Sequence, residues 1–479
     1  QNRVVIVEAP DKEKDKLPNE KTLLDWIATG GKNIKPYIDN TTDKPLLDKR
    51  PAPGKIISQQ ADSAIATTTI LLSNGIKVIL KPTVFKNDQI LINGYRFGGT
   101  SLASDQDFTS AEMAGNIVGS SGVADFTQAQ LDKMLSGKNV SVRPYISDIT
   151  EGFSANSTPK DFETAMQLIY LYFTHPRKDA DIWQSNLSQT KSMLVNRSLD
   201  PGSVYQDTIS ATMSNHNFRG MITNIERLKS ANFEKAFSFY KDRFADANGF
   251  VFTIVGAFNV AVIKPYLETY LGSLPSANSK ETYNNLNIGP PAGQITKIVN
   301  KGIGDKSSVQ LVFHGNYEYN DANNMQLDAL ESILDIKLTE RLREQESGVY
   351  SPGVRASYKK IPSGRYSFTV AFECAPANVD KLINASLDEI NKVKQNGGLP
   401  VDIEKFKAQE ARSTQVQLKE NIFWAGYLGA ASQNQESADA ILNHVSSLND
   451  VTVQTTKDAA NKYLSGSNLI RFILMPEKK

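Results

Sequence analysis

The sequence predicts an α+β fold of two homologous domains, each a mostly antiparallel sheet with helices packed on one face. Strand-like runs are mixed with long helical patterns without strict alternation, which favours α+β over a parallel α/β fold. A helix followed by an apolar strand occurs at residues 232–256 and again at 453–476, a shift of about 220 residues. Repetition of one such unit indicates two copies of one domain.

Length and composition agree with two soluble domains. A chain of 479 residues is longer than one typical core. Its 40% hydrophobic and 22% charged residues are ordinary for globular proteins, and a net charge of +1 gives no reason to expect nucleic acid or an anionic membrane as partner. No apolar run is long enough to span a bilayer. The single cysteine, Cys374, excludes an internal disulfide and fits a periplasm or the cytoplasm.

The domain boundaries follow from composition and from a third copy of the strand. Residues 2–10, NRVVIVEAP, share the spacing from Asn to Pro with residues 468–476, NLIRFILMP, and resemble NGFVFTIVG at 248–256. Because no helix precedes the first copy, we expect Gln1 to lie within the tail of an earlier repeat. The expected parts are this tail strand with a linker (1–66), a first domain (67–273), a linker (274–294) and a second domain (295–479).

The periodicity of the sequence places the individual elements. In the first domain Ser73-Asn74-Gly75 predicts a hairpin turn. The expected helices are at 20–28, 104–119, 127–135, 159–174, 179–197, 232–244, 260–271, 326–346, 379–395, 403–418 and 453–464. The expected strands are at 70–72, 76–80, 89–95, 140–149, 248–256, 295–300, 308–314, 354–358, 366–372 and 468–476.

The helix predicted at 326–346 is the central element of the second domain. Five leucines recur on it at steps of three and four, so one face should be buried: Leu327, Leu330, Leu334, Leu338 and Leu342. Gly348 is expected to end the helix in a left-handed conformation, and residues 349–351 are expected to open a strand.

The end of this helix resembles a known family. Leu342-Arg343-Glu344 is followed by Gly348 and by Tyr350, seven residues after the arginine. This pattern is similar to the C-terminal, zinc-free half of bacterial pitrilysin/insulinase-type zinc metallopeptidases, the inverzincins. The resemblance implies that Arg343 and Tyr350 bind the peptide carbonyl of a substrate. Arg341 is the alternative arginine, and the helix dipole or strand propensity could equally explain an arginine and a tyrosine here.

A zinc site of that family requires two histidines four residues apart on a helix with a glutamate beside them. The chain has only four histidines, none of which share that spacing: His175, His216, His314 and His444. The corresponding helix carries AEMAGNIV at 111–118. We therefore expect no catalytic residue and no metal on this chain, with zinc in the missing or partner half.

The resemblance thus implies the non-catalytic, substrate-binding half of a zinc metalloendopeptidase that hydrolyses peptides in a closed chamber. Its partners would be a zinc-bearing half, in the same polypeptide or a separate chain, and a peptide substrate. The expected location is the periplasm or cell envelope, with the cytoplasm still open. The alternatives are a non-catalytic scaffold or peptide-binding subunit of a larger assembly, and an enzyme with unrelated chemistry at the domain interface.

Overall fold

The computed structural model describes residues 4–32, 34, 44–349 and 352–477. The chain divides into two compact units, residues 1–43 and 44–479. The first unit contains a 3-10 turn (Asp11–Lys16) and the predicted helix, α1 (Glu20–Thr29). Residues 4–10, the described part of the strand expected at 2–10, are exposed and belong to neither sheet, so the tail strand of an earlier repeat stays a prediction. A strand forms only where a neighbour takes up its backbone hydrogen bonds.

The first sheet of the larger unit has seven strands in the order β1-β2-β3-β7-β4-β6-β5. Neighbouring strands are antiparallel except β3 and β7, which are parallel. The strands are β1 (Ile56–Asp62), β2 (Thr67–Leu72), β3 (Lys77–Pro82), β4 (Ile90–Phe97), β5 (Val140–Ile146), β6 (Thr150–Ser157) and β7 (Val251–Gly256). The hairpin turn forms as predicted, with Gly75 at a φ of 87°. β1 lies inside the predicted linker and was missed.

The second sheet has five strands in the order β10-β11-β9-β12-β8, and only β12 and β8 are parallel. Its strands are β8 (Gln294–Asn300), β9 (Ser307–Asn316), β10 (Gly353–Lys359), β11 (Arg365–Cys374) and β12 (Leu469–Met475). Without the β1–β2 hairpin, the first sheet has the corresponding order, with β7 in the place of β12. The predicted α+β class with two homologous domains is therefore confirmed, while the exact domain boundaries stay predictions.

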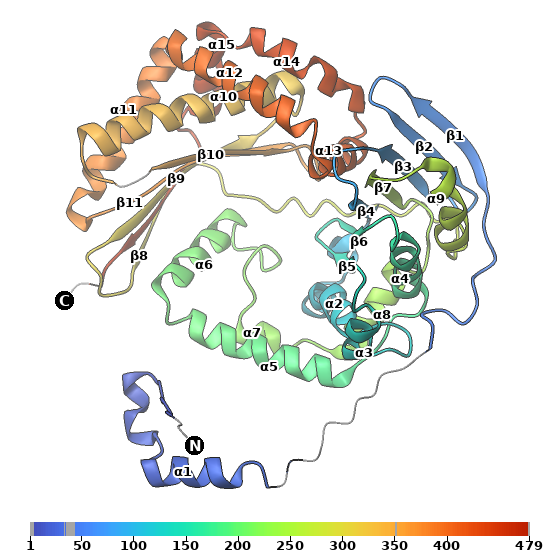
Figure 1. Cartoon of the computed structure of the whole chain (residues 1–479). Helices are drawn as coiled ribbons and strands as arrows, with labels where there is room; N and C mark the ends of the chain where they lie inside the picture. The colour runs from blue at the N-terminus through green and yellow to red at the C-terminus, as the bar shows by residue number, and fades with distance from the viewer. Residues whose placement is uncertain (1–3, 33, 35–43, 350–351, 478–479) are drawn as a thin grey trace. The chain divides into compact units, whose positions relative to one another are not determined.

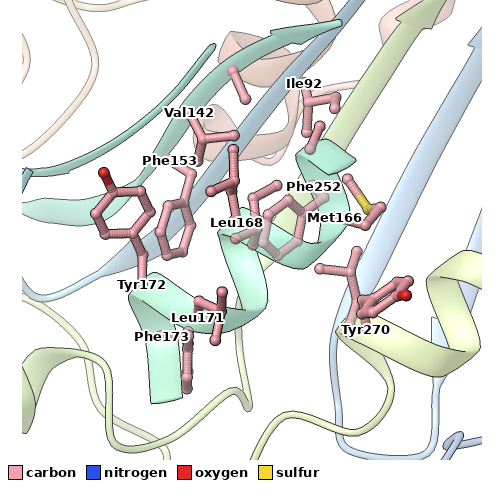
Figure 2. Packing of buried hydrophobic residues seen from close by; sticks show 14 of the residues in the cluster. Ile92, Val142, Phe153, Met166, Leu168, Leu171, Tyr172, Phe173, Phe252 and Tyr270 are labelled. Carbon is pink, nitrogen blue, oxygen red and sulfur yellow. The ribbon is translucent and has the colours of Figure 1, made fainter. Parts of the chain in front are cut away.

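Helices cover one face of the first sheet and form its core. The helices of this region are α2 (Phe108–Ser120), α3 (Gln128–Met134), α4 (Phe162–Thr174), α5 (Ala180–Arg197), α7 (Ile225–Leu228), α8 (Phe233–Arg243) and α9 (Val260–Tyr266) with a π-helical end (Leu267–Leu271). Figure 2 shows Met166 and Leu168 of α4 facing Phe153 of β6 and Phe252 of β7, and all four side chains are buried.

The second core lies between its sheet and a second layer of helices (Figure 1). These helices are α10 (Asp321–Leu338) with a π-helical end (Thr339–Gln345), α11 (Val379–Asn396), α12 (Pro400–Gln417), the short α14 (His444–Ser447) and α15 (Val453–Tyr463). All five leucines of the predicted row are fully buried, so that prediction is confirmed.

The end of the α10 region differs from the prediction. Ser347, with a φ of 50°, takes the left-handed conformation expected of Gly348. Gly348 is instead needed for close packing, because a Cβ atom there would lie 2.8 Å from Leu382 Cδ2. Residue 349 is outside any strand, residues 350 and 351 lie outside the described residues, and β10 begins at Gly353.

Two helices missing from the sequence prediction cross between the domains. α13 (Asn421–Asn434), from the second domain, packs on β4 and β7 of the first sheet. α6 (Pro201–Met213), from the first domain, packs on β8 and β12 of the second sheet (Figure 1). Each sheet is therefore covered on its second face by a helix from the other domain.

Candidate functional site

Arg343 lies in the segment that ends the α10 region, residues 339–349. Arg343 is in the π-helical stretch and its side chain is exposed, while Tyr350 lies outside the described residues. Arg341 is half-buried: its Nη2 is 2.9 Å from Glu346 Oε1, and its Nη1 donates to Gln345 Oε1 at 3.1 Å. Of the two arginines, Arg341 is thus held against the end of its own helix, and Arg343 is on the surface.

Helix α11 holds this segment in place. Glu346 forms a 2.6 Å ion pair with Lys381 of α11, and hydrogen bonding to Lys381 holds the pKa of Glu346 below its usual value. Gly348 packs against Leu382 on the same helix. The backbone that follows Arg343 is therefore held against α11 on both sides of Ser347, the residue with the left-handed conformation.

The helix that would carry zinc ligands does not fit a metal. On α2, Ala111 and Ala114 are fully buried, and a Cβ atom on Gly115 would lie 2.9 Å from the backbone N of Ile146. Glu112 accepts from Thr223 and lies 3.6 Å from Arg227. An imidazole has no room on this packed face. Among the described residues, no three His, Cys, Asp or Glu side chains are grouped so that they could hold a metal ion.

A cavity of about 450 Å³ beside α10 collects carboxylates that the sequence did not reveal. Asp328 and Glu331 come from α10 and Glu410 from α12. Burial raises the pKa of Asp328 to about 6, although the Tyr358 hydroxyl donates to it at 2.9 Å. His444 Nε2 lies 2.9 Å from Glu410, and this hydrogen bond raises the pKa of the histidine. These contacts connect α10, α12, α14 and β10, which is a structural role.

The outer edge strands at corresponding ends of the two sheets, β5 and β10, are each interrupted at one position. On β5, Pro144 has no backbone N–H to offer. On β10, the Ala356 N–H donates to Glu331 Oε2 at 2.7 Å instead of pointing into solvent. A proline and a capping carboxylate are two ways of preventing another chain from adding to a sheet edge. The row of outward backbone groups is therefore interrupted at Pro144 on β5 and at Ala356 on β10.

The predicted linker at 274–294 is bound to both domains. Glu281 pairs with Arg243 at 2.7 Å, and Asn285 Nδ2 donates to the carbonyl of Pro362 in the β10–β11 connection. A cavity of about 520 Å³ lies beside it, lined by both domains. Arg219 borders this cavity, but its guanidinium already donates to the carbonyls of Thr100 and Ala103.

A buried carboxylate lies next to this linker. Glu151 of β6 is fully buried, accepts from Gly99 N at 2.6 Å and lies 3.6 Å from Arg96. Burial raises its pKa to about 7, even though the Gly99 amide and Arg243 and Arg96 favour the charged form. Glu151 does not line the cavity of about 520 Å³ beside the linker.

Comparison with known proteins identifies this architecture. Residues 230–410 match the model of the Peptidase M16 inactive domain. The chain is 24% identical, over 93% of its length and 47% of the relative, to a zinc protease PQQL-like protein of Arabidopsis thaliana. The crystal structure of the periplasmic protease PqqL from Escherichia coli aligns with a TM-score of 0.80 and 20% identity, over 98% of this chain and 52% of that one.

A structure of about the same length also matches. The peptidase M16 inactive domain from Pseudomonas fluorescens aligns with a TM-score of 0.73 and 15% identity, over 86% of this chain and 99% of that one. The chain spans about half the length of the curated relatives it matches. No helix in the described ranges is both long and apolar enough to cross a membrane. Residues 230–410 therefore match the inactive domain of the M16 peptidases, and the chain as a whole is similar to about half the length of the PqqL-like zinc proteases.

Proposed function

We propose that this chain is the non-catalytic, substrate-binding half of a zinc metalloendopeptidase. Its zinc and catalytic groups would be on another half, in the same polypeptide or in a separate chain. The observation that carries the proposal is the match of residues 230–410 to an inactive peptidase domain. The packing of Gly115 against β5, where a histidine has no room, supports it from the other domain.

Arg343 and Tyr350 would be the contribution of this half to substrate binding. A guanidinium donates through several N–H groups in a fixed fork, and a phenol adds one more donor, so together they can hold a peptide carbonyl and stabilise negative charge on its oxygen. The exposure of the Arg343 side chain favours this role.

The blocked sheet edges restrict how the peptide would lie. An extended peptide can bind as an added strand, but Pro144 and the Glu331 carboxylate oppose that at β5 and β10. We therefore assign backbone pairing of the substrate to the zinc-bearing half. This half would close the chamber, exclude water and supply side chains.

The test is reconstitution with the zinc-bearing half. Hydrolysis of an unfolded peptide should require both halves and should stop when a chelator removes the metal. Arg343→Ala should lower kcat/KM by about a hundredfold, and Tyr350→Phe should act in the same direction. Arg412→Ala, which removes another exposed arginine, should leave the rate unchanged.

The outcomes separate the alternatives. An unchanged rate in Arg343→Ala would exclude the assigned role. A complex that binds the peptide without cleaving it would favour a non-catalytic scaffold or peptide-binding subunit. We further propose a periplasmic or cell-envelope location, because the E. coli relative is described as periplasmic. Cell fractionation tests this: recovery in the cytoplasm would contradict it.

A further inference from the structure

The two sheets have four outer strands, and three of these strands are interrupted. β5 and β10 are interrupted at Pro144 and at Ala356. β1 has a register shift between Ile56 and Ser58, which marks a bulge. The fourth, β8, contains no proline and pairs with β12 without a register shift over residues 294–300. Prolines, bulges and capping groups protect edges from pairing with other chains, so β8 is the outer strand of the described sheets without these devices.

The outer side of β8 presents a regular row of backbone groups. On the inner side, the Leu469 amide of β12 donates to the Gly293 carbonyl just before β8 begins. In this parallel pair every second residue bonds to the neighbouring strand, so the odd-numbered residues of β8 face β12 and the even-numbered ones face outward. Thr296, Ile298 and Asn300 therefore each direct an N–H and a C=O outward. The side chain of Ile298, in the middle of this row, is 57% exposed.

The first sheet shows which kind of neighbour such a strand accepts. β3 and β8 occupy the same place in the two sheets, because each is the parallel neighbour of a central strand, β7 or β12. On its other side β3 pairs with β2 in an antiparallel arrangement, and β2 pairs in turn with β1. None of the described strands pairs with β8 on that side (Figure 1). An antiparallel strand added to β8 would therefore take the position that β2 has in the first sheet.

Two lysines determine which strand would fit this edge. Ile295 and Val299 pack in the apolar cluster under α6, so Lys297 between them points to the same face of the sheet. Lys301 follows at the same spacing. Neither lysine side chain has a hydrogen-bond or ion-pair partner in the described part of the chain. A second copy of β8, paired in the register centred on Ile298, would bring lysines of the two copies next to each other, and like charges oppose pairing.

We propose that β8 is a docking edge for an extended, acidic segment of another protein, which adds to the second sheet as an antiparallel strand. Acidic side chains of that segment lie beside Lys297 and Lys301 on the α6 face, and apolar side chains lie beside Ile298 on the opposite face. The backbone hydrogen bonds supply affinity, and the side chains select the partner. This surface goes beyond the proposed peptidase function, because it involves neither Arg343 nor Tyr350.

The first test measures the charge preference of the edge with short fluorescent peptides, blocked at both ends, and the full chain. A peptide of alternating glutamate and valine should bind at least about tenfold more tightly than one of alternating lysine and valine, measured by fluorescence anisotropy. Lys297→Glu combined with Lys301→Glu should reverse this preference. Lys419→Glu, which changes an exposed lysine between α12 and α13, should leave the preference as it is.

A proline tests the backbone part of the interaction. Ile298→Pro removes an N–H that faces away from β12, so the sheet should keep its own hydrogen bonds while peptide binding weakens by about tenfold or more. Ile303→Pro, at a residue that is 92% exposed in the turn after β8, should bind the peptide normally. Circular dichroism checks that each variant is folded. The charge reversal, which leaves the backbone unchanged, decides the proposal if Ile298→Pro unfolds.

Three results would overturn the docking edge. The first is equal binding of the acidic and basic peptides, and the second is undiminished binding of the acidic peptide by folded Ile298→Pro. The third is a dimer of the chain in sedimentation that Ile298→Pro dissociates, which would assign the edge to a second copy. The peptides are tested on this chain without the zinc-bearing half, so failure here leaves the peptidase proposal standing, and an inactive reconstituted peptidase leaves the docking edge standing.

Discussion

The two helices that cross between the domains cover equivalent sheets with different chemistry. α13 adds polar contacts to an apolar cluster on the first sheet: the centre of the Trp424 ring lies 3.8 Å from Lys81 Nζ, and Asn421 forms hydrogen bonds with Thr83 and Gln89. α6 covers the second sheet mainly with Tyr205 and Ile209, packed against Ile470 and Phe472. Hydrogen bonds are directional, whereas apolar burial is not. We infer that α13 fixes the relative position of the domains and that α6 mainly buries surface.

Trp424 takes part in both the apolar cluster and the polar contacts of α13, so it is the residue with the largest expected effect. It is buried, packs with Leu428 against Ile79 and Val255, and its Nε1 donates to the carbonyl of Leu418. Trp424→Ala should lower the free energy of unfolding by about 3–5 kcal/mol, measured by urea denaturation. Ile422→Ala, on the exposed side of the same helix at 69% exposure, should change it by less than about 0.5 kcal/mol. Equal effects would show that α13 is not held through this face.

Asn421 tests whether the polar contacts of α13 matter individually. Its side chain is fully buried, accepts from Thr83 Oγ1 at 2.7 Å and donates to Gln89 Oε1 at 3.0 Å. Asn421→Ala should cost about 2–3 kcal/mol, because a fully buried side chain is removed and two partly buried polar groups lose their partner. In a double-mutant cycle with Thr83→Val, the two losses should not add. Full additivity would mean that the pair contributes no interaction energy.

The crossing helices also show what sequence reasoning could reach. The leucine row of α10 and the Asn-Gly hairpin were predicted because their signals are local: a helical period and a turn that needs a positive φ. α13 gave no such signal, since Ile422 and Gly426 interrupt any simple apolar stripe and its packed face is completed by another domain. The polar strand β1 was missed for the same reason, as it is ordered by pairing with β2.

The features of the candidate site also divide into those that sequence spacing indicates and those that only the fold brings together. Arg343 could be singled out from spacing, but the ion pair that occupies Arg341 depends on Glu346 and the fold of the helix end. The carboxylates of Asp328 and Glu410 lie 82 residues apart in sequence and meet only because α10 and α12 pack together. Such groupings of distant residues leave no pattern in a single sequence.

The first sheet has a further polar element whose effect depends on pH. The pKa of the buried Glu151 carboxyl is raised to about 7 by burial, so the folded chain keeps this proton at pH values where the unfolded chain has lost it. The contribution of this group to stability is therefore greatest below its unfolded pKa and is lost as pH rises toward and through 7. We expect a loss of about 3 kcal/mol over this range. Glu151→Gln should flatten that slope, measured by denaturation at a series of pH values.

An exposed glutamate provides the control for this prediction. Glu226, on α7, has a side chain that is 79% exposed, and Glu226→Gln should leave the pH profile unchanged. A Glu151→Gln profile that superimposes on that of the unmodified chain would show that other groups set the pH dependence. In that case, of the two polar elements discussed for the first sheet, only the α13 contacts would contribute to its stability.

The smallest predicted effects come from removing one hydroxyl at each crossing helix. Tyr205 donates to the carbonyl of Phe472 at 3.0 Å in a buried environment, and Tyr95 bonds to Ser432, which is partly exposed, at 2.9 Å. Tyr205→Phe should cost about 1 kcal/mol and Tyr95→Phe about 0.5 kcal/mol, because water can replace the lost partner of Ser432. Unfolding of the two variants in parallel gives the comparison. A loss well above 2 kcal/mol in Tyr205→Phe would mean that α6 depends on a directional bond as α13 does, and the distinction between the two interfaces would disappear.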